Sequence, residues 1–222
     1  MNNLSKIKGN NNKILFILDD KSEIENFTEK EIDLINNFNL SITGNGNIIK
    51  VKIDKREDIE SFLNSEGLYI SVVGDNNKIN LDKIKYTVNP LLGITGLKIF
   101  IGGAADPFLS PDLPRYASGC SVEIGNNTVF CGTRIYLQDD NSSVKIGDNC
   151  MFSWGIDVWC TDVHTITDLK GNPQNYGKSI DIGNHVWVGK DVKIGKNTKI
   201  SNDSIIGWGS IVTKKFDETN VI

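Results

Sequence analysis

The 222-residue chain is predicted to fold as an all-β parallel solenoid built from six-residue units. Between residues 182 and 212 an aliphatic residue occupies every sixth position, and glycine follows four of these residues. A second, smaller residue recurs four positions after each aliphatic one. The aliphatic set is Ile182, Val188, Ile194, Ile200, Ile206 and Val212. Each unit therefore fits one short strand followed by a corner.

Other regular structures do not fit this spacing. A six-residue step on an α-helix of about 3.6 residues per turn rotates a side chain by about 600°, so the aliphatic set would scatter over several faces. A flat strand needs an apolar residue at every second position, where this segment has Asn184, Lys190 and Lys196. Short strands separated by turns are the remaining solution.

The same register recurs upstream, with interruptions. The residues six apart are Ile124 and Phe130, then Ile146, Phe152, Val158 and His164, with Cys150, Ile156 and Asp162 in the second position. Six-residue units are therefore expected over residues 122–216, interrupted at 137–143 and 165–179. Insertions in a repeat protein map to loops on one face, which is often the binding face.

The first ninety residues are organised differently. Gly/Asn turns followed by β-rich runs recur at 9–14, 44–49 and 74–79, which indicates an internal repeat. Between them, Thr28 and Glu31 have the spacing of a helix capping box. Two interpretations stay open for residues 1–90: irregular N-terminal coils of the solenoid with helical insertions, or a small separate α/β module. Residues 91–222 are the expected hexapeptide-repeat catalytic domain.

Composition narrows the class of protein. A net charge of −4 argues against a nucleic-acid partner. The polar start of the chain and the short apolar runs predict a soluble, cytoplasmic protein without a membrane span. Four cysteines without C-x-x-C spacing predict reduced thiols. Catalytic zinc generally needs three protein ligands, and the two histidines do not supply them, so no metal site is expected.

The repeat pattern resembles the hexapeptide-repeat acyltransferases, and most closely the bacterial saccharide O-acetyltransferases. The resemblance is carried by the segments 147–157, 162–164, 182–189 and 204–214. It implies a left-handed parallel β-helix with triangular coils of three hexads. It also implies acetyl-CoA as co-substrate, a saccharide acceptor and assembly as a homotrimer.

His164 is the predicted general base. Acyl transfer from a thioester to a hydroxyl requires removal of the hydroxyl proton, a task suited to histidine near neutral pH. The resemblance gives the matching histidine this role, whereas a structural alternative is a capping histidine bonded to a loop carbonyl. Asp162 would orient the imidazole or bind an acceptor hydroxyl, unless it is a solvated turn residue. His185, in a corner, is interpreted as a structural histidine bonded to a neighbouring coil.

Coenzyme A is expected along the C-terminal coils. Trp187 directly precedes an inward valine, so it should point outward. Six lysines against two aspartates between 182 and 216 form a basic strip for the phosphates. By resemblance, the cofactor-contacting residues are Trp187, Gly189, Lys190, Trp208, Thr213 and Lys214. Trp208 replaces a small residue of the family pattern, which predicts a reshaped groove. Relatives continue beyond the position of Ile222, so a longer natural protein is expected.

Aromatic side chains near the insertions are the predicted acceptor site. The candidates are Trp154, Trp159, Arg115 and Tyr116. The resulting function is direct O-acetylation of a bacterial surface saccharide by acetyl-CoA. N-acetylation of an amino sugar, free or nucleotide-linked, is the alternative within the same class. A non-catalytic β-helical glycan-binding or scaffold protein is the alternative of another class.

Overall fold

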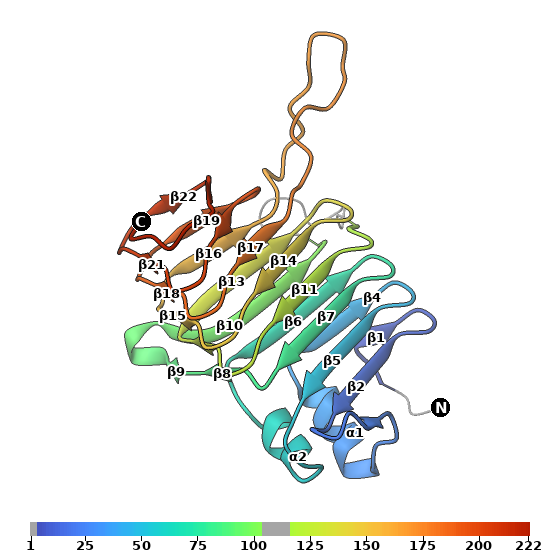
Figure 1. The fold of residues 1–222 in the computed structure, drawn as a ribbon. Coiled ribbons are helices and arrows are strands. Elements are labelled where there is room, and N and C mark those ends of the chain that lie inside the picture. The colour runs from blue at the N-terminus through green and yellow to red at the C-terminus, as the bar shows by residue number, and fades with distance from the viewer. Residues whose placement is uncertain (1–3, 104–115) are drawn as a thin grey trace.

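The computed structural model describes residues 4–103 and 116–222, and these wind into a parallel β-helix with three sheets (Figure 1). Successive strands visit sheet A, sheet B and sheet C in turn, so each coil has an A–B, a B–C and a C–A corner. Sheet A contains β1 (Ile7–Lys8), β4 (Leu40–Thr43), β6 (Leu68–Val73), β10 (Ile94–Ile101), β13 (Gly132–Leu137), β16 (Ile156–Trp159), β19 (Lys193–Gly195) and β22 (Ile211–Val212).

Sheets B and C complete the coils. Sheet B contains β2 (Lys13–Ile17), β3 (Glu23–Ile24), β5 (Ile48–Lys52), β7 (Lys78–Asp82), β11 (Ser121–Ile124), β14 (Ser143–Ile146), β17 (Ile180–Ile182), β20 (Lys199–Ile200) and β23 (Lys215–Phe216). Sheet C contains β8 (Lys85–Tyr86), β12 (Val129–Phe130), β15 (Met151–Phe152), β18 (Trp187–Val188) and β21 (Ile205–Ile206). The named strands pair in parallel except β3 with β2 and β9 (Val88–Asn89) with β10.

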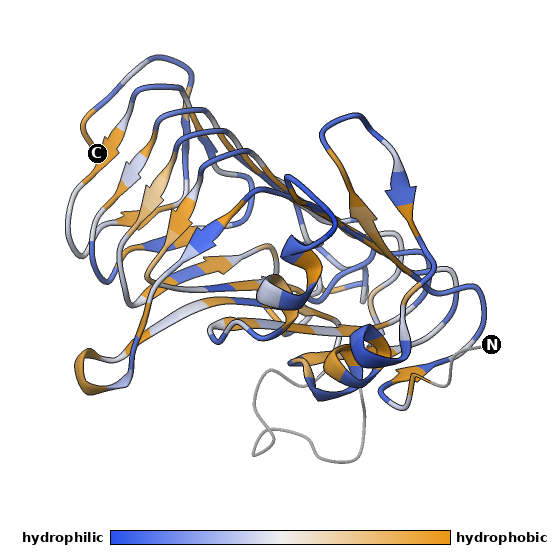
Figure 2. Ribbon diagram, turned by 90° about the horizontal axis from the view of Figure 1, so that it is seen from below, coloured by the Kyte–Doolittle hydropathy of each residue, from blue (hydrophilic) through white to orange (hydrophobic). Residues whose placement is uncertain are grey.

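The predicted hexad register forms the core of the C-terminal coils. All six aliphatic residues from Ile182 to Val212 are at most 1% exposed. The smaller second residues Val186, Val192, Thr198 and Ser204 are also buried. Figure 2 shows hydrophobic residues concentrated in the strands and hydrophilic residues in many of the turns. The repeat spacing therefore identified the inward face correctly.

One part of the predicted register is wrong. His164 and Asp162 are exposed and lie outside the coil, not in inward positions. The chain leaves the coil after the fully buried Cys160 and returns at Ile180, the first residue of β17. The insertion therefore begins about four residues earlier than the pattern suggested, and its loop stands away from the coils in Figure 1. The six-residue step from Val158 to His164 is a coincidence of spacing.

Helices take the place of sheet C in the first coils. In chain order, α1 (Glu29–Asn37) and α2 (Asp58–Leu63) each lead from a strand of sheet B to the next strand of sheet A. The predicted capping box of α1 is present: the Thr28 side chain accepts from the Glu31 N–H and the Glu31 carboxylate accepts from the Thr28 N–H. A short 3₁₀ turn, η1 (Pro90–Leu92), follows β9.

The repeated Gly/Asn turns stack at the A–B corner. The Nδ2 atom of Asn47 donates to Asn12 Oδ1 at 3.0 Å and to the Gly74 carbonyl at 2.9 Å. Asn77 repeats the arrangement on Asn47 one coil later, at 3.0 Å. Gly44 has φ 134°, and a Cβ there would lie 2.0 Å from the Gly74 carbonyl oxygen. The repeat thus encodes a ladder of asparagine side chains with glycines where the coils approach most closely.

Candidate catalytic corner

The insertion between β16 and β17 carries His164 at an A–B corner. Its first turn is tight: Val163 has φ 63°, an uncommon conformation for a β-branched residue. The His164 N–H donates to the Asp162 carbonyl at 2.6 Å, and the Val163 N–H donates to Thr161 Oγ1 at 2.9 Å. The backbone that presents His164 is therefore held in a defined, strained turn.

Asn175 braces this turn from the returning limb of the loop. Its Nδ2 atom donates to the His164 carbonyl at 2.8 Å and to Asp162 Oδ2 at 2.9 Å. The Lys196 ammonium on the next coil donates to the same carboxylate oxygen. Hydrogen bonds from Lys196 and Asn175 lower the pKa of Asp162 below its ordinary value. The sequence pointed to Asp162 but gave no indication of Asn175 or Lys196 as its partners.

The imidazole of His164 has no partner within residues 4–103 and 116–222, where no hydrogen bond or ion pair joins it to another side chain. In particular, the Asp162 carboxylate holds the base of the loop and does not contact the imidazole. Both ring nitrogens of His164 are consequently open to an incoming group.

His185 differs from His164. It sits at a B–C corner with φ 55°, and its Nδ1 lies 2.8 Å from Asp203 Oδ1 on the next coil. Both side chains are well exposed. The bond to a neighbouring coil is the one expected of a structural histidine.

Trp187 lies on the outer face of sheet C, as predicted, and is 49% exposed. In register with it are Met151 on one side and Ile205 on the other, both also exposed. We call Met151, Trp187 and Ile205 the apolar stripe. A continuous exposed row of this kind marks an interface or a ligand wall.

Lys190 is held at a C–A corner between two indoles. Its ammonium lies 5.7 Å from the ring centroid of Trp154 and 4.9 Å from that of Trp208, and it donates to Asp191 Oδ2 at 2.7 Å. Trp208 Nε1 donates to the same oxygen at 3.3 Å. Hydrogen bonds from Lys190 and Trp208 lower the pKa of Asp191. A predicted acceptor residue, Trp154, thus joins two predicted cofactor residues, because all three follow an inward residue by two positions.

The remaining cofactor candidates are less concentrated than expected. Thr213 and Lys214 are exposed at the A–B corner between β22 and β23. Gly189 is explained by packing, since a Cβ there would lie 2.8 Å from the Ile206 carbonyl oxygen. Four lysines of the predicted strip form ion pairs with aspartates. They are Lys190, Lys193, Lys196 and Lys199.

The acceptor candidates do not form one cluster. Trp159, the last residue of β16, packs on Tyr136 with ring centroids 4.3 Å apart. Tyr116 is 61% exposed, whereas Arg115 lies outside the described residues. Trp154 belongs to the Lys190 corner.

Coil topology separates His164, the candidate general base, from Trp187, a candidate cofactor-contacting residue. The His164 loop leaves from an A–B corner, and Trp187 lies on sheet C. In a three-sided coil, sheet C is the side opposite the A–B corner. His164 and Trp187 of one chain therefore face different directions.

The chain is similar to acetyltransferases of sialic acid polymers. No family model matches it. It is 30% identical over 117 residues to a polysialic acid O-acetyltransferase of Neisseria meningitidis, covering 52% of this chain and 54% of that protein. The match thus spans about half the length of this curated relative. The predicted resemblance to hexapeptide-repeat acyltransferases is confirmed.

Two solved structures share the hexapeptide-repeat fold over 97% of this chain at 23% identity. The polySia-specific acetyltransferase NeuO superimposes with a TM-score of 0.63 over 78% of its chain. The polysialic acid O-acetyltransferase OatWY superimposes with a TM-score of 0.66 over 82% of its chain. The coil is accordingly the left-handed parallel β-helix that the resemblance implied. Neither described helix has the length and apolar character needed to cross a bilayer.

Three thiols of this hexapeptide-repeat chain are unsuited to nucleophilic chemistry. Cys120, Cys150 and Cys160 are buried. Burial raises the pKa of each of these thiols above its ordinary value. A raised pKa leaves little thiolate, the nucleophilic form, at neutral pH.

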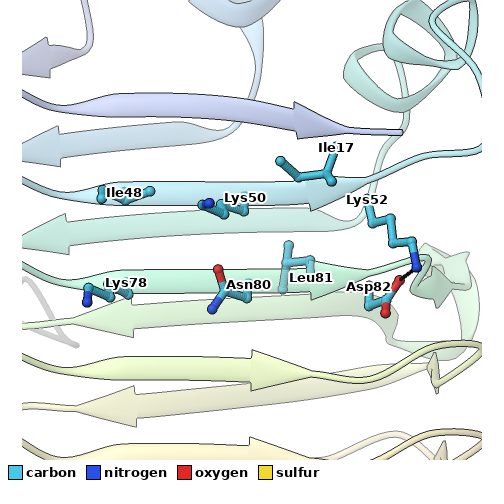
Figure 3. Close-up of a pocket in the computed structure, with 8 residues that line it drawn as sticks. All are labelled: Ile17, Ile48, Lys50, Lys52, Lys78, Asn80, Leu81 and Asp82. Carbon is cyan, nitrogen blue, oxygen red and sulfur yellow. Dashed lines mark ion pairs between the residues drawn. The ribbon is translucent and has the colours of Figure 1, made fainter. Parts of the chain in front are cut away.

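A hollow of about 550 Å³ lies on the outer face of sheet B and is lined by residues of β2, β5 and β7 (Figure 3). Lys50, Lys52 and Lys78 line it. Lys50 pairs with Glu23 at 2.8 Å and Lys52 with Asp82 at 3.5 Å, so two of the three charges are compensated. Its lining has no histidine, and its one carboxylate, Asp82, is paired with Lys52, so we assign the hollow no chemistry.

Proposed function

We propose that this chain transfers an acetyl group from acetyl-CoA to a hydroxyl of a bacterial surface saccharide, with a sialic acid polymer as the first acceptor to test. The observation that carries the proposal is the His164 imidazole, which is exposed, has no side-chain partner among the described residues and is presented by a braced insertion. In this proposal residues 91–222 carry the chemistry, and the reaction takes place in the cytoplasm.

The proposed chemistry is a direct transfer. The acceptor hydroxyl gives its proton to His164 as its oxygen attacks the thioester carbonyl carbon. The tetrahedral intermediate then expels the coenzyme A thiolate, which takes up the proton, and the ester product remains on the saccharide. The buried thiols support a mechanism without an acyl-cysteine intermediate.

The site is proposed to form between two copies in a trimer. A second copy that packs its A–B corner against the apolar stripe would bring its His164 to Trp187 of the first chain, which one chain alone does not achieve. Closed cyclic packing satisfies every copy equally. The nucleotide end of acetyl-CoA would then contact Lys190, Lys214 and Thr213. Trp208 would narrow or redirect the groove in which acetyl-CoA lies.

Subunit mixing tests the shared site. His164→Ala and Trp187→Ala proteins are each expected to have low activity, and trimers reassembled from both should regain activity because one interface contains both natural residues. Reassembly of each variant with itself is the control. A fully active monomer in light scattering, or mixtures no more active than the separate variants, would overturn this arrangement.

Mass spectrometry tests the reaction itself. The protein is incubated with acetyl-CoA and saccharides that carry or lack a free amine, including sialic acid oligomers. Ester products on amine-free acceptors are expected. Products confined to amino sugars would replace the proposal by N-acetylation. Absence of acetyl-CoA binding in calorimetry would favour a non-catalytic glycan-binding protein instead.

A further inference from the structure

Four aromatic rings form a continuous row on the outer face of sheet A. The ring centroids of Tyr69 and Phe100 are 5.4 Å apart, those of Phe100 and Tyr136 are 5.1 Å apart, and those of Tyr136 and Trp159 are 4.3 Å apart. These residues come from β6, β10, β13 and β16, four neighbouring strands. We call them the ring row. At about 4.8 Å per strand it is about 14 Å long.

The rings are not needed to fill the core. Each ring alternates along its strand with inward aliphatic residues, such as Ile99 and Ile101 around Phe100. Tyr136 is 5% exposed, Phe100 and Trp159 are half-buried, and Tyr69 is 37% exposed. The row is therefore most open at its Tyr69 end and least open at Tyr136.

A row of charged residues runs beside the rings. Lys98, Arg134, Asp157 and Lys193 are in register on β10, β13, β16 and β19. Asp157 accepts hydrogen bonds from Arg134 at 2.7 Å and from Lys193 at 2.6 Å. Lys98 has no ion pair with any described residue. Three cations against one anion make this face locally positive in a chain with a net charge of −4.

The ring row leads to the His164 insertion. Its last ring, Trp159, is followed directly by Cys160, where the chain leaves the coil at the A–B corner. Phe100 and Tyr136 also lie near the ends of their strands, on the same side of sheet A. From Phe100 to Trp159 the row therefore runs along the A–B edge to the base of the insertion that carries His164, and Tyr69, in register with Lys98, extends it diagonally away from that edge.

From this arrangement we infer that the ring row and the adjacent cations bind an extended anionic saccharide chain and guide it to His164. The inference rests on the proposed function and adds that the acceptor is an oligomer or polymer rather than a single sugar. Apolar faces of successive sugars would pack on the rings, and their carboxylates would face Lys98 and Arg134. A single sugar would reach only the Trp159 end.

Chain-length dependence provides the test. Binding of sialic acid oligomers of increasing length is measured by calorimetry without acetyl-CoA. Affinity should rise with length in the natural protein. Lys98→Gln should reduce the affinity for long oligomers by about twofold to fivefold, as expected for one exposed charge pair, and leave single sugars unaffected. Phe100→Ala should reduce it by about threefold to tenfold.

Lys78→Gln is the matched control, because Lys78 is another outward lysine without an ion pair among the described residues, but on sheet B; it is exposed, whereas Lys98 is half-buried. It should not change binding at any length. The thermal midpoint of Phe100→Ala shows whether the variant is folded. Lys98→Gln tests saccharide binding beside the ring row without removing a packed ring. Binding that is absent, independent of length, or equally affected by Lys78→Gln overturns the inference. Length-dependent binding without any acetyl transfer would support saccharide binding along the ring row and reject the proposed function.

Discussion

In the first coils a helix leads from sheet B back to sheet A, whereas from β8 onward a two-residue strand of sheet C makes that connection. The helices bury Ile35, Ile59 and Leu63 in a core that is continuous with that of the later coils. The strands of sheet C instead expose Met151, Trp187 and Ile205. The connection from sheet B to sheet A thus covers the core with helices in the first coils. In the later coils the same connection carries exposed apolar side chains on its outer face.

The A–B corner shows the same contrast. In the early coils it is filled by the ladder of Asn12, Asn47 and Asn77, of which the last two are buried. In the later coils it is opened by the insertion that carries His164. The early corner satisfies its own polar groups, as a structural corner does, whereas the later one leaves the His164 imidazole without a partner in the part of the chain that the structure describes. We therefore expect substitutions in the asparagine ladder to change mainly stability, and substitutions at His164 to change mainly turnover.

The largest expected effect is on turnover. His164→Ala should lower turnover by about 10² to 10⁴-fold, because a general base contributes on that order in the transition state. Acetyl-CoA affinity and the thermal midpoint should stay nearly unchanged. Steady-state kinetics and calorimetry measure these quantities. His185→Ala is the matched control, since His185 already bonds Asp203, and an equal loss there would reject the assignment of the base.

The next largest effect is on stability in the other region. Asn47→Ala removes four side-chain hydrogen bonds and leaves buried groups of Asn77 and Gly74 unsatisfied. We expect a loss of about 3 kcal/mol in the free energy of unfolding, with turnover of the folded protein unchanged. Denaturant titration measures it. Asn45→Ala, in the exposed part of the same turn, should lose less than about 1 kcal/mol. Similar losses for both variants would mean that the ladder contributes no more to the free energy of unfolding than the exposed part of the turn.

Most of the fold could be predicted from the sequence because every six-residue unit of the solenoid places its residues in the same structural environment. Each of the residues from Ile182 to Val212 meets the same inward environment, so one spacing determines a whole core. The insertion breaks this regularity, and the six-residue spacing alone does not distinguish Val158, which stays in the coil, from His164, which leaves it. Only the return of the chain at Ile180 fixes where the loop begins.

The candidate site was less predictable, because the residues in contact there are separated in the sequence by distances that do not follow the six-residue repeat. Asn175 and Asp162 are thirteen residues apart across a loop. The lysine strip looked free in sequence, yet four of its lysines are paired with aspartates, two of which, Asp157 and Asp162, lie on other coils upstream. Composition counts charges and does not reveal their partners.

These pairings refine the expected role of the lysines. Lys214 has no ion pair among the described residues, whereas Lys190 is held by Asp191 and two indoles. Lys214→Gln should therefore weaken acetyl-CoA binding by up to about fivefold at low salt, and Lys190→Gln by less. The difference should shrink at high salt, because screening weakens exposed pairs. Acetyl-pantetheine, which lacks the nucleotide phosphates, is the control donor; an equal loss for it would assign the lysines to the fold.

The smallest effect concerns the base of the catalytic loop. The pKa of Asp162 is lowered by hydrogen bonds from Lys196 and Asn175, so the stabilisation it gives is present above the ordinary aspartate value and is lost as pH falls through the lowered value. Hydrogen exchange of the loop, corrected for intrinsic rates, should therefore be faster in Asp162→Asn than in the natural protein at pH 7, by about twofold to fivefold for an exposed pair. At a pH well below 4 the two proteins should exchange alike, because the natural carboxyl is then also neutral. Asp181→Asn, an exposed aspartate of β17 beside the loop, should change exchange at neither pH. A difference that persists at low pH would mean that shape, and not charge, braces the loop that presents His164.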